Sequence, residues 1–73
     1  MAIFHVGDRV RVSAEAENVP ASWREQRGRV VLPGESKPAL GGRRGEWEWW
    51  YPVELEGSKQ RVMLQESWLE RAN

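Results

Sequence analysis

The sequence predicts an all-β fold: a small five-stranded barrel with one short helical turn before the last strand. Three observations predict it. Short stretches alternate apolar and polar residues with a period of two, and clusters rich in Gly and Pro separate them. The third is the absence of cysteine from 73 residues. A chain this small without disulfides needs a sheet that protects its own edges.

The first strand is expected over residues 9–12, after a turn at Gly7-Asp8, because Arg and Val alternate there. Its two valines are predicted to face the core and its two arginines to face water. Residues 13–27 lose this alternation, and Pro20 blocks a continuous helix through them. We expect a long ordered loop with a helical turn near residues 22–26.

The second strand is expected over residues 28–32, where Val30 and Val31 favour β-structure before a Pro-Gly pair ends the strand. Residues 33–45 contain two Pro and four Gly. They are therefore predicted to form a surface loop.

The third strand, residues 47–56, shows the clearest alternation in the chain. Its odd-numbered residues are apolar and are predicted to face the core, whereas its even-numbered residues are mostly glutamates. Trp50 lies on the polar face, and Pro52 is expected at an edge or a bulge because it cannot donate a ladder hydrogen bond. The predicted core residues of this strand are Trp47, Trp49, Tyr51, Val53 and Leu55.

Residues 56–58 predict a hairpin turn, and residues 59–64 return as the fourth strand. A single helical turn is expected over residues 65–68, followed by a last strand over residues 69–71. This order of elements is the layout of an SH3-like barrel. No linker, repeat or low-complexity segment interrupts it, so residues 1–73 are predicted to form a single domain.

Composition excludes several classes of function. With no cysteine, the chain offers no thiolate nucleophile and no thiolate metal site. Eleven basic and eleven acidic side chains give no net charge, which argues against a general polyanion binder. No apolar run reaches the roughly 20 residues of a membrane span, and the first residues do not resemble a signal peptide. A cytoplasmic protein is therefore expected.

We predict no catalytic residue, no metal site, no cofactor and no small-molecule substrate. His5 is the only histidine and Asp8 the only aspartate, and both flank the first turn at the start of the chain. The glutamates of the third strand lie on its predicted solvent face. No glycine-rich phosphate loop is followed by a helix. The chain is therefore not expected to be an enzyme.

Four groups of residues, spread over nearly the whole chain, stand in a recognisable order. They are Phe4-x-x-Gly7-Asp8-x-Val10-x-Val12, Pro20-x-x-Trp23-Arg24-x-x-x-Gly28-x-Val30, Tyr51-x-Val53 and Val62-x-Leu64-x-Glu66-x-Trp68-Leu69-Glu70-x-Ala72. This order resembles the C-terminal SH3-like domain of the nitrile hydratase beta subunit, and the last group is the most specific. The first group also resembles the variable chain of ferredoxin-thioredoxin reductase and the type II dihydrofolate reductases.

The resemblance implies a role for Arg24. In the nitrile hydratase family the matching Arg reaches the oxidised cysteine ligands of a metal centre in the alpha subunit, so Arg24 would act on a partner protein. Ser22 and Glu25 replace a Tyr and a Gly of the family pattern. Reductase activity is not implied, because residues 61–64 lack the Gln and Tyr that contact cofactor and folate in the type II reductases. The resemblance thus implies a non-catalytic accessory or small subunit.

A partner-binding surface is predicted from Trp and Arg residues. Trp50 lies opposite the expected core face, and exposed Trp is enriched at interaction hot spots. Alternatively, the loop from Pro20 to Trp23 covers Trp50. The partner is expected to be another protein or a second copy of the chain. The predicted contact residues are Trp23, Arg24, Arg43, Arg44 and Trp50.

Nucleic acid is the alternative partner. Most of the cations are Arg, which suits bidentate contacts to phosphate, and Arg together with Trp can bind single strands by stacking. Residues 1–45 carry a net charge of +3 and the remainder carries −3. This asymmetry would serve head-to-tail self-association equally well. The sequence leaves these possibilities open, with a protein-interaction module preferred.

Overall fold

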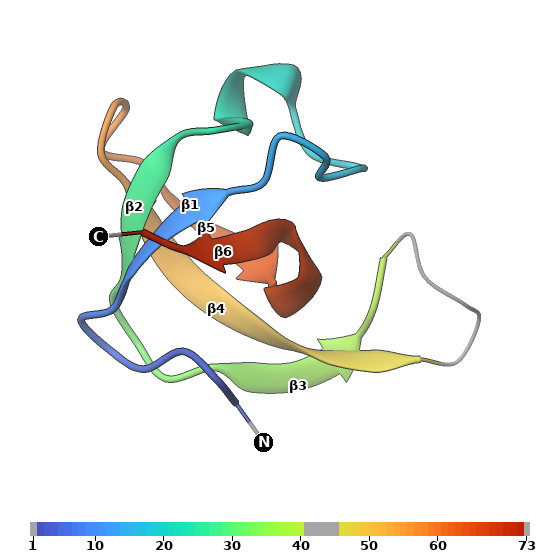
Figure 1. The fold of residues 1–73 in the computed structure, drawn as a ribbon. Coiled ribbons are helices and arrows are strands. Elements are labelled where there is room, and N and C mark those ends of the chain that lie inside the picture. Colours follow the sequence, from blue (N-terminus) through green and yellow to red (C-terminus); the bar gives the residue numbers. More distant parts are fainter. Residues whose placement is uncertain (1, 41–45, 73) are drawn as a thin grey trace.

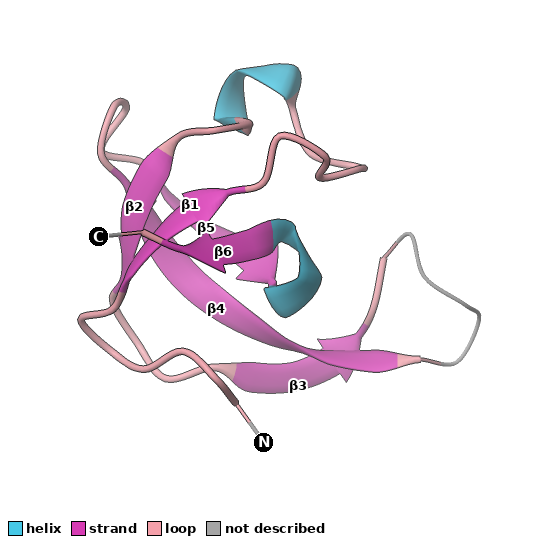
Figure 2. Ribbon diagram, viewed as in Figure 1, coloured by secondary structure: helices cyan, strands magenta, loops and turns pink. Residues whose placement is uncertain are grey.

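The computed structural model describes residues 2–40 and 46–72, which form strands and two short 3₁₀ turns (Figure 1 and Figure 2). The elements in chain order are β1 (Arg9–Val12), η1 (Ala21–Trp23), β2 (Arg27–Val30), β3 (Glu35–Pro38), β4 (Trp47–Leu55), β5 (Arg61–Gln65), η2 (Glu66–Trp68) and β6 (Leu69–Arg71). The all-β class is confirmed, and η2 is the helical turn expected before the last strand. Within the described residues, no helix is long and apolar enough to cross a membrane.

One antiparallel sheet contains all these strands, with β4 at its centre. β5 pairs with one edge of β4, whereas β2 and β3 pair with the other edge. β2 also pairs with β1, and β1 pairs with β6. In the described part of the chain no pairing joins β5 to β6, so the sheet curls without closing (Figure 1). The order of the elements is the predicted SH3-like layout, but the described sheet has six strands where five were expected and does not close into a barrel.

β3 corrects the sequence prediction, which assigned residues 33–45 to a surface loop. All four residues of β3 are exposed, so it has no alternation of buried and exposed positions for a sequence pattern to reveal. β3 pairs with residues 47–50 of β4, on the same edge that β2 uses further along. β2 and β3 therefore act as one strand that is interrupted at residues 31–34.

Pro52 faces this interruption. Its carbonyl oxygen accepts a hydrogen bond from the amide of Val31 at 3.0 Å. The nitrogen and the carbonyl of one strand residue point to the same neighbouring strand. The nitrogen of Pro52, which has no proton, thus points to the gap between β2 and β3, where no ladder donor is required. This placement agrees with the prediction of a bulge.

β4 does not keep one face in the core along its whole length. In its second half the predicted core residues are fully buried, namely Tyr51, Val53 and Leu55. In its first half the faces exchange: Trp50 is 8% exposed, whereas Trp47 is 64% exposed and Trp49 is half-buried. Four consecutive buried residues, 50–53, mark where the twisted strand is covered on both faces. The core prediction for Trp47 is wrong, because this part of β4 pairs with the exposed β3.

The segment before β1 is attached to the core through Tyr51. The Tyr51 hydroxyl accepts hydrogen bonds from the amides of Ile3 and Phe4, at 3.2 and 3.4 Å, and donates one to Glu66 at 2.6 Å. The Phe4 ring packs edge to face on Tyr51, with centroids 5.4 Å apart. Phe4 is consequently buried, although it belongs to no strand. The other strands complete the core with Val10, Val12, Val30, Leu64 and Leu69.

Candidate protein-interaction site

Trp23 and Arg24, two of the predicted contact residues, lie together at the end of η1. The turn begins at Pro20, whose carbonyl accepts a hydrogen bond from the Trp23 amide at 2.9 Å. Trp23 is half-buried and packs against the core. Arg24 is exposed, and its Nε donates to the carbonyl of Ala16 at 2.9 Å. The end of η1 thus carries a partly exposed indole ring and, at the next residue, a guanidinium group that is bonded to the loop.

Trp50 is not exposed, so the prediction that it lies on the contact surface is corrected. Its indole ring packs edge to face against Trp68, with centroids 5.3 Å apart and an interplanar angle of 79°. Its Nε1 donates a hydrogen bond to the carbonyl of Pro38 at 3.2 Å. The alternative that the Pro20–Trp23 loop covers Trp50 is right about burial but not about the cover, because the contacts that hold the ring come from Trp68 of η2 and Pro38 of β3.

The remaining predicted contact residues, Arg43 and Arg44, lie outside the described residues. Within the described part, the large aromatic surface belongs instead to Trp47. Sequence reasoning missed it because the alternation of the third strand placed it on the core face. The available signal was its position at the start of a strand, beside a glycine-rich segment that supplies no apolar partner.

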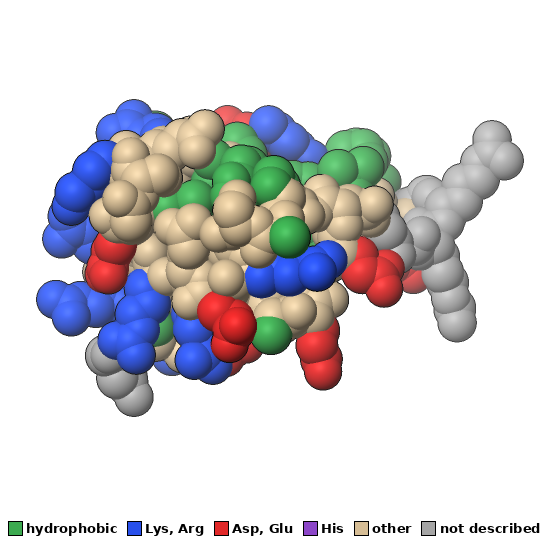
Figure 3. Space-filling view, turned by 90° about the horizontal axis from the view of Figure 1, so that it is seen from above, with side chains coloured by type: hydrophobic (Ala, Val, Ile, Leu, Met, Phe, Trp, Pro, Cys, Tyr) green, Lys and Arg blue, Asp and Glu red, His purple; other side chains and the backbone are tan. Residues whose placement is uncertain are grey.

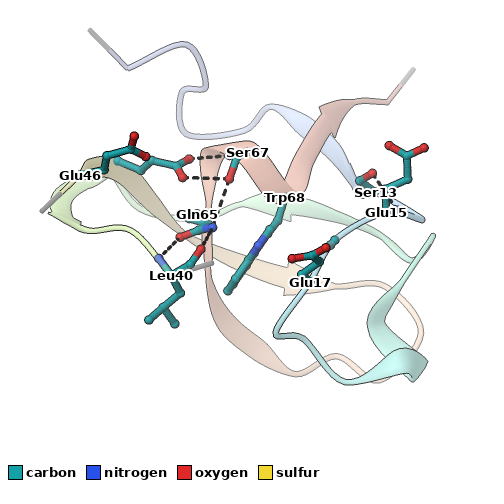
Figure 4. Close-up of a pocket in the computed structure, with 10 residues that line it drawn as sticks. Ser13, Glu15, Glu17, Leu40, Glu46, Gln65, Ser67 and Trp68 are labelled. Atoms are coloured by element: carbon teal, nitrogen blue, oxygen red, sulfur yellow. Dashed lines mark hydrogen bonds between the residues drawn. The ribbon is translucent and has the colours of Figure 1, made fainter. Parts of the chain in front are cut away.

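A cleft of about 410 Å³ opens between the loop after β1, the end of β3 and η2 (Figure 4). Trp68 forms part of its wall, and carboxylates reach it from two sides of the molecule. Glu48 is held in place, because its two oxygens accept hydrogen bonds from the Ser67 amide at 2.8 Å and the Ser67 hydroxyl at 2.9 Å. The acidic residues that line the cleft are Glu15, Glu17, Glu46 and Glu48.

Gln65 fixes the chain at one side of this cleft (Figure 4). Its side chain is 2% exposed. Its Nε2 donates to the Leu40 carbonyl at 2.7 Å and to the Ser67 hydroxyl at 3.1 Å, and its Oε1 accepts from the Leu40 amide at 2.8 Å. The amide group thus binds the backbone after β3 as a neighbouring strand would. The sequence placed Gln65 in a helical turn and gave no indication of this contact.

The carboxylates of the cleft are hydrogen-bond acceptors, and His5 and Asp8 are not among the residues that line it. His5 and Asp8 close a turn, in which the His5 amide donates to the Asp8 carboxylate at 2.9 Å. The same carboxylate pairs with Arg71 at 3.4 Å. Among the residues that the structure describes, no group of three His, Cys, Asp or Glu side chains converges to hold a metal ion.

Comparison with known proteins identifies a solved structure of the same fold. The chain is similar to a chain of the thiocyanate hydrolase (SCNase) of Thiobacillus thioparus, solved as the recombinant apo-enzyme. The TM-score is 0.82 at 24% sequence identity, and the match covers 99% of this chain and 78% of that chain. No protein-family model and no curated protein matches the sequence. The chain therefore has the fold of that thiocyanate hydrolase chain over nearly its whole length.

Proposed function

We propose that the chain is a non-catalytic protein-interaction module, an accessory or small subunit related to the C-terminal domain of the nitrile hydratase beta subunit. The fold match carries this proposal, because 99% of the chain corresponds to a chain of thiocyanate hydrolase, an enzyme of the nitrile hydratase family. The residue groups that resemble the nitrile hydratase beta subunit support it independently. A cytoplasmic location stays a prediction.

The chemistry of the residues supports a role beside a catalytic partner. The chain has no cysteine, so the thiolate ligands that the resemblance implies would belong to the partner. Arg24, held by Ala16, would supply the guanidinium that the resemblance places near those ligands. Trp23 lies next to it and would add apolar contact area. The proposed contact surface therefore includes Trp23 and Arg24 but not Trp50, which is buried.

A nucleic-acid partner remains the second candidate, favoured by four arginines on the outer faces of β1 and β2. Those strands carry no outward aromatic side chain on which a base could stack. A protein partner fits the same surface better.

The proposal is tested by purifying the tagged chain from its native host and measuring the mass and composition of the complex. We expect a stoichiometric complex with a second protein, and no hydration of nitriles or thiocyanate by the isolated chain. A photo-cross-linking residue at Trp23 should capture that protein, whereas one at Lys37, which is exposed on β3, should not. Recovery of the chain alone, or with nucleic acid, would contradict the proposal.

A further inference from the structure

The outer face of β1 and β2 carries four arginines in two directly opposed pairs. In the register of the two strands, Arg9 lies opposite Arg29, and Arg11 lies opposite Arg27. The residues between them are buried. We call the four outward residues, Arg9, Arg11, Arg27 and Arg29, the arginine face. Figure 3 shows Lys and Arg side chains gathered toward the end of the molecule where β1 and β2 lie in Figure 1.

This arrangement costs the fold stability, because like charges that lie directly opposite in a sheet repel each other. Within the described residues, Arg11 is the one arginine of the four that forms an ion pair, which is hydrogen-bonded and joins it to Glu70. Among the described residues, Arg9, Arg27 and Arg29 have no ion pair. Packing does not require these charges either, since three of the four side chains are exposed. An anion from outside the chain would form ion pairs with these arginines.

Carboxylates border the arginine face on both sides. Glu54 lies opposite Arg29 in the next strand, and Glu70 lies opposite Arg11 on the other side. Arg9 and Arg29 also line a shallow hollow of about 300 Å³, together with Glu54, Glu56 and Lys59. The positive surface is therefore a strip two strands wide, with negative charge along its edges.

The strip selects a narrow anionic ligand that lies along the strands. Outward residues of one strand are two positions apart, which separates the two arginine pairs by about 6.6 Å. Alternate side chains of an extended peptide have the same spacing, and each carboxylate can bind an Arg through two hydrogen bonds. A single-stranded nucleic acid fits less well, because β1 and β2 present no outward aromatic side chain on which a base could stack.

We propose that the arginine face binds an acidic segment of the partner protein, in extended conformation along β1 and β2, with carboxylates at alternate residues. This inference rests on the proposed function as an interaction module and adds the chemistry of the partner. In an extended peptide the side chains at the intervening positions point away from the arginine face, so carboxylates there make no contact with the arginines. The surface therefore discriminates by the pattern of charge as well as by its sign.

The test uses the intact chain and two fluorescein-labelled peptides of equal composition. One repeats Glu-Thr, which places carboxylates at alternate residues, and the other repeats Glu-Glu-Thr-Thr. Binding is measured by fluorescence anisotropy at low salt, with an oligothymidylate of the same charge as a third probe. We expect the alternating peptide to bind about tenfold more tightly than the other probes. Arg29→Gln should weaken that binding about tenfold, as expected for the loss of one charge-assisted contact.

Lys37→Gln on β3 is the matched control, because it removes the same charge outside the arginine face. It should change the affinity by less than about twofold, as for a distant surface charge. Equal binding of both peptides, tighter binding of the oligothymidylate, self-association through the arginine face, or an equal effect of Lys37→Gln would each overturn the inference. If the native complex forms but Arg29→Gln does not weaken it, this inference fails while the proposed function stands.

Discussion

At the scale of single residues, two tryptophans in one strand have opposite roles. Trp50 is enclosed by Trp68 and β3, whereas Trp47, three positions earlier, is 64% exposed. Trp50→Ala should lower the free energy of unfolding by about 3–5 kcal/mol, as for other buried Trp residues. Trp47→Ala should change it by less than about 0.5 kcal/mol. Urea denaturation of both variants checks this, and equal losses would contradict the burial that the structure shows.

Tyr51 gives the stability a dependence on alkaline pH. Burial raises the pKa of its hydroxyl above the ordinary value near 10, and the hydrogen bond to Glu66 raises it further. The folded state therefore favours the neutral phenol. This contribution is complete below pH 10 and is lost as the pH rises through the folded pKa, with a slope of at most about 1.4 kcal/mol per pH unit. Urea denaturation between pH 8 and pH 11 should show a shallower decline for Tyr51→Phe than for the parent chain; parallel curves would refute the assignment.

At the scale of elements, the approach of β2 to β4 depends on Gly28. A Cβ atom at Gly28 would lie 2.6 Å from the carbonyl oxygen of Glu54 and 2.7 Å from a methyl group of Val53. Gly28→Ala should therefore destabilise the domain by about 1–3 kcal/mol, the usual cost of overpacking. Gly57→Ala is the control, because its Cβ would meet only the side chain of Gln26, at 3.1 Å. The two variants are compared by thermal unfolding, and a larger effect at Gly57 would argue against this packing.

The same scale shows what the sequence could and could not predict. Strict alternation around Val10 and Val12 predicted β1 and its buried face, and the predicted bounds of β6 match those observed. β3 was missed because its residues are all exposed and are held by pairing with β4 rather than by an apolar face. Trp50 was misplaced because alternation assumes one core face along β4, whereas twist exchanges the faces near residue 50. Contacts between residues far apart in the sequence determine both the formation of β3 and the burial of Trp50. The same is true of the hydrogen bonds between Gln65 and Leu40.

At the scale of the whole molecule, a chain of 73 residues has little stability to lose. Typical values of 0.05–0.15 kcal/mol per residue give roughly 4–11 kcal/mol in total. The Phe4 ring joins the segment before β1 to Tyr51. The guanidinium carbon of Arg71, in β6, lies 5.5 Å from the centroid of the Phe4 ring. The buried Phe4 side chain therefore connects the first residues and β6 to Tyr51 at the centre of the fold. The stability that it contributes is a large fraction of the total free energy of unfolding.

Phe4→Ala should accordingly cost about 3–5 kcal/mol and lower the midpoint of thermal unfolding by more than about 12 °C. Val6→Ala, two positions away at a residue that is 56% exposed, should leave the midpoint nearly unchanged. Circular dichroism during heating measures both variants, and equal midpoints would contradict a structural role for Phe4.

A partner that binds only the folded state adds stability in proportion to the logarithm of its concentration. Addition of the native partner should therefore restore much of the midpoint that Phe4→Ala loses, which ties the small margin of the fold to its proposed role in a complex.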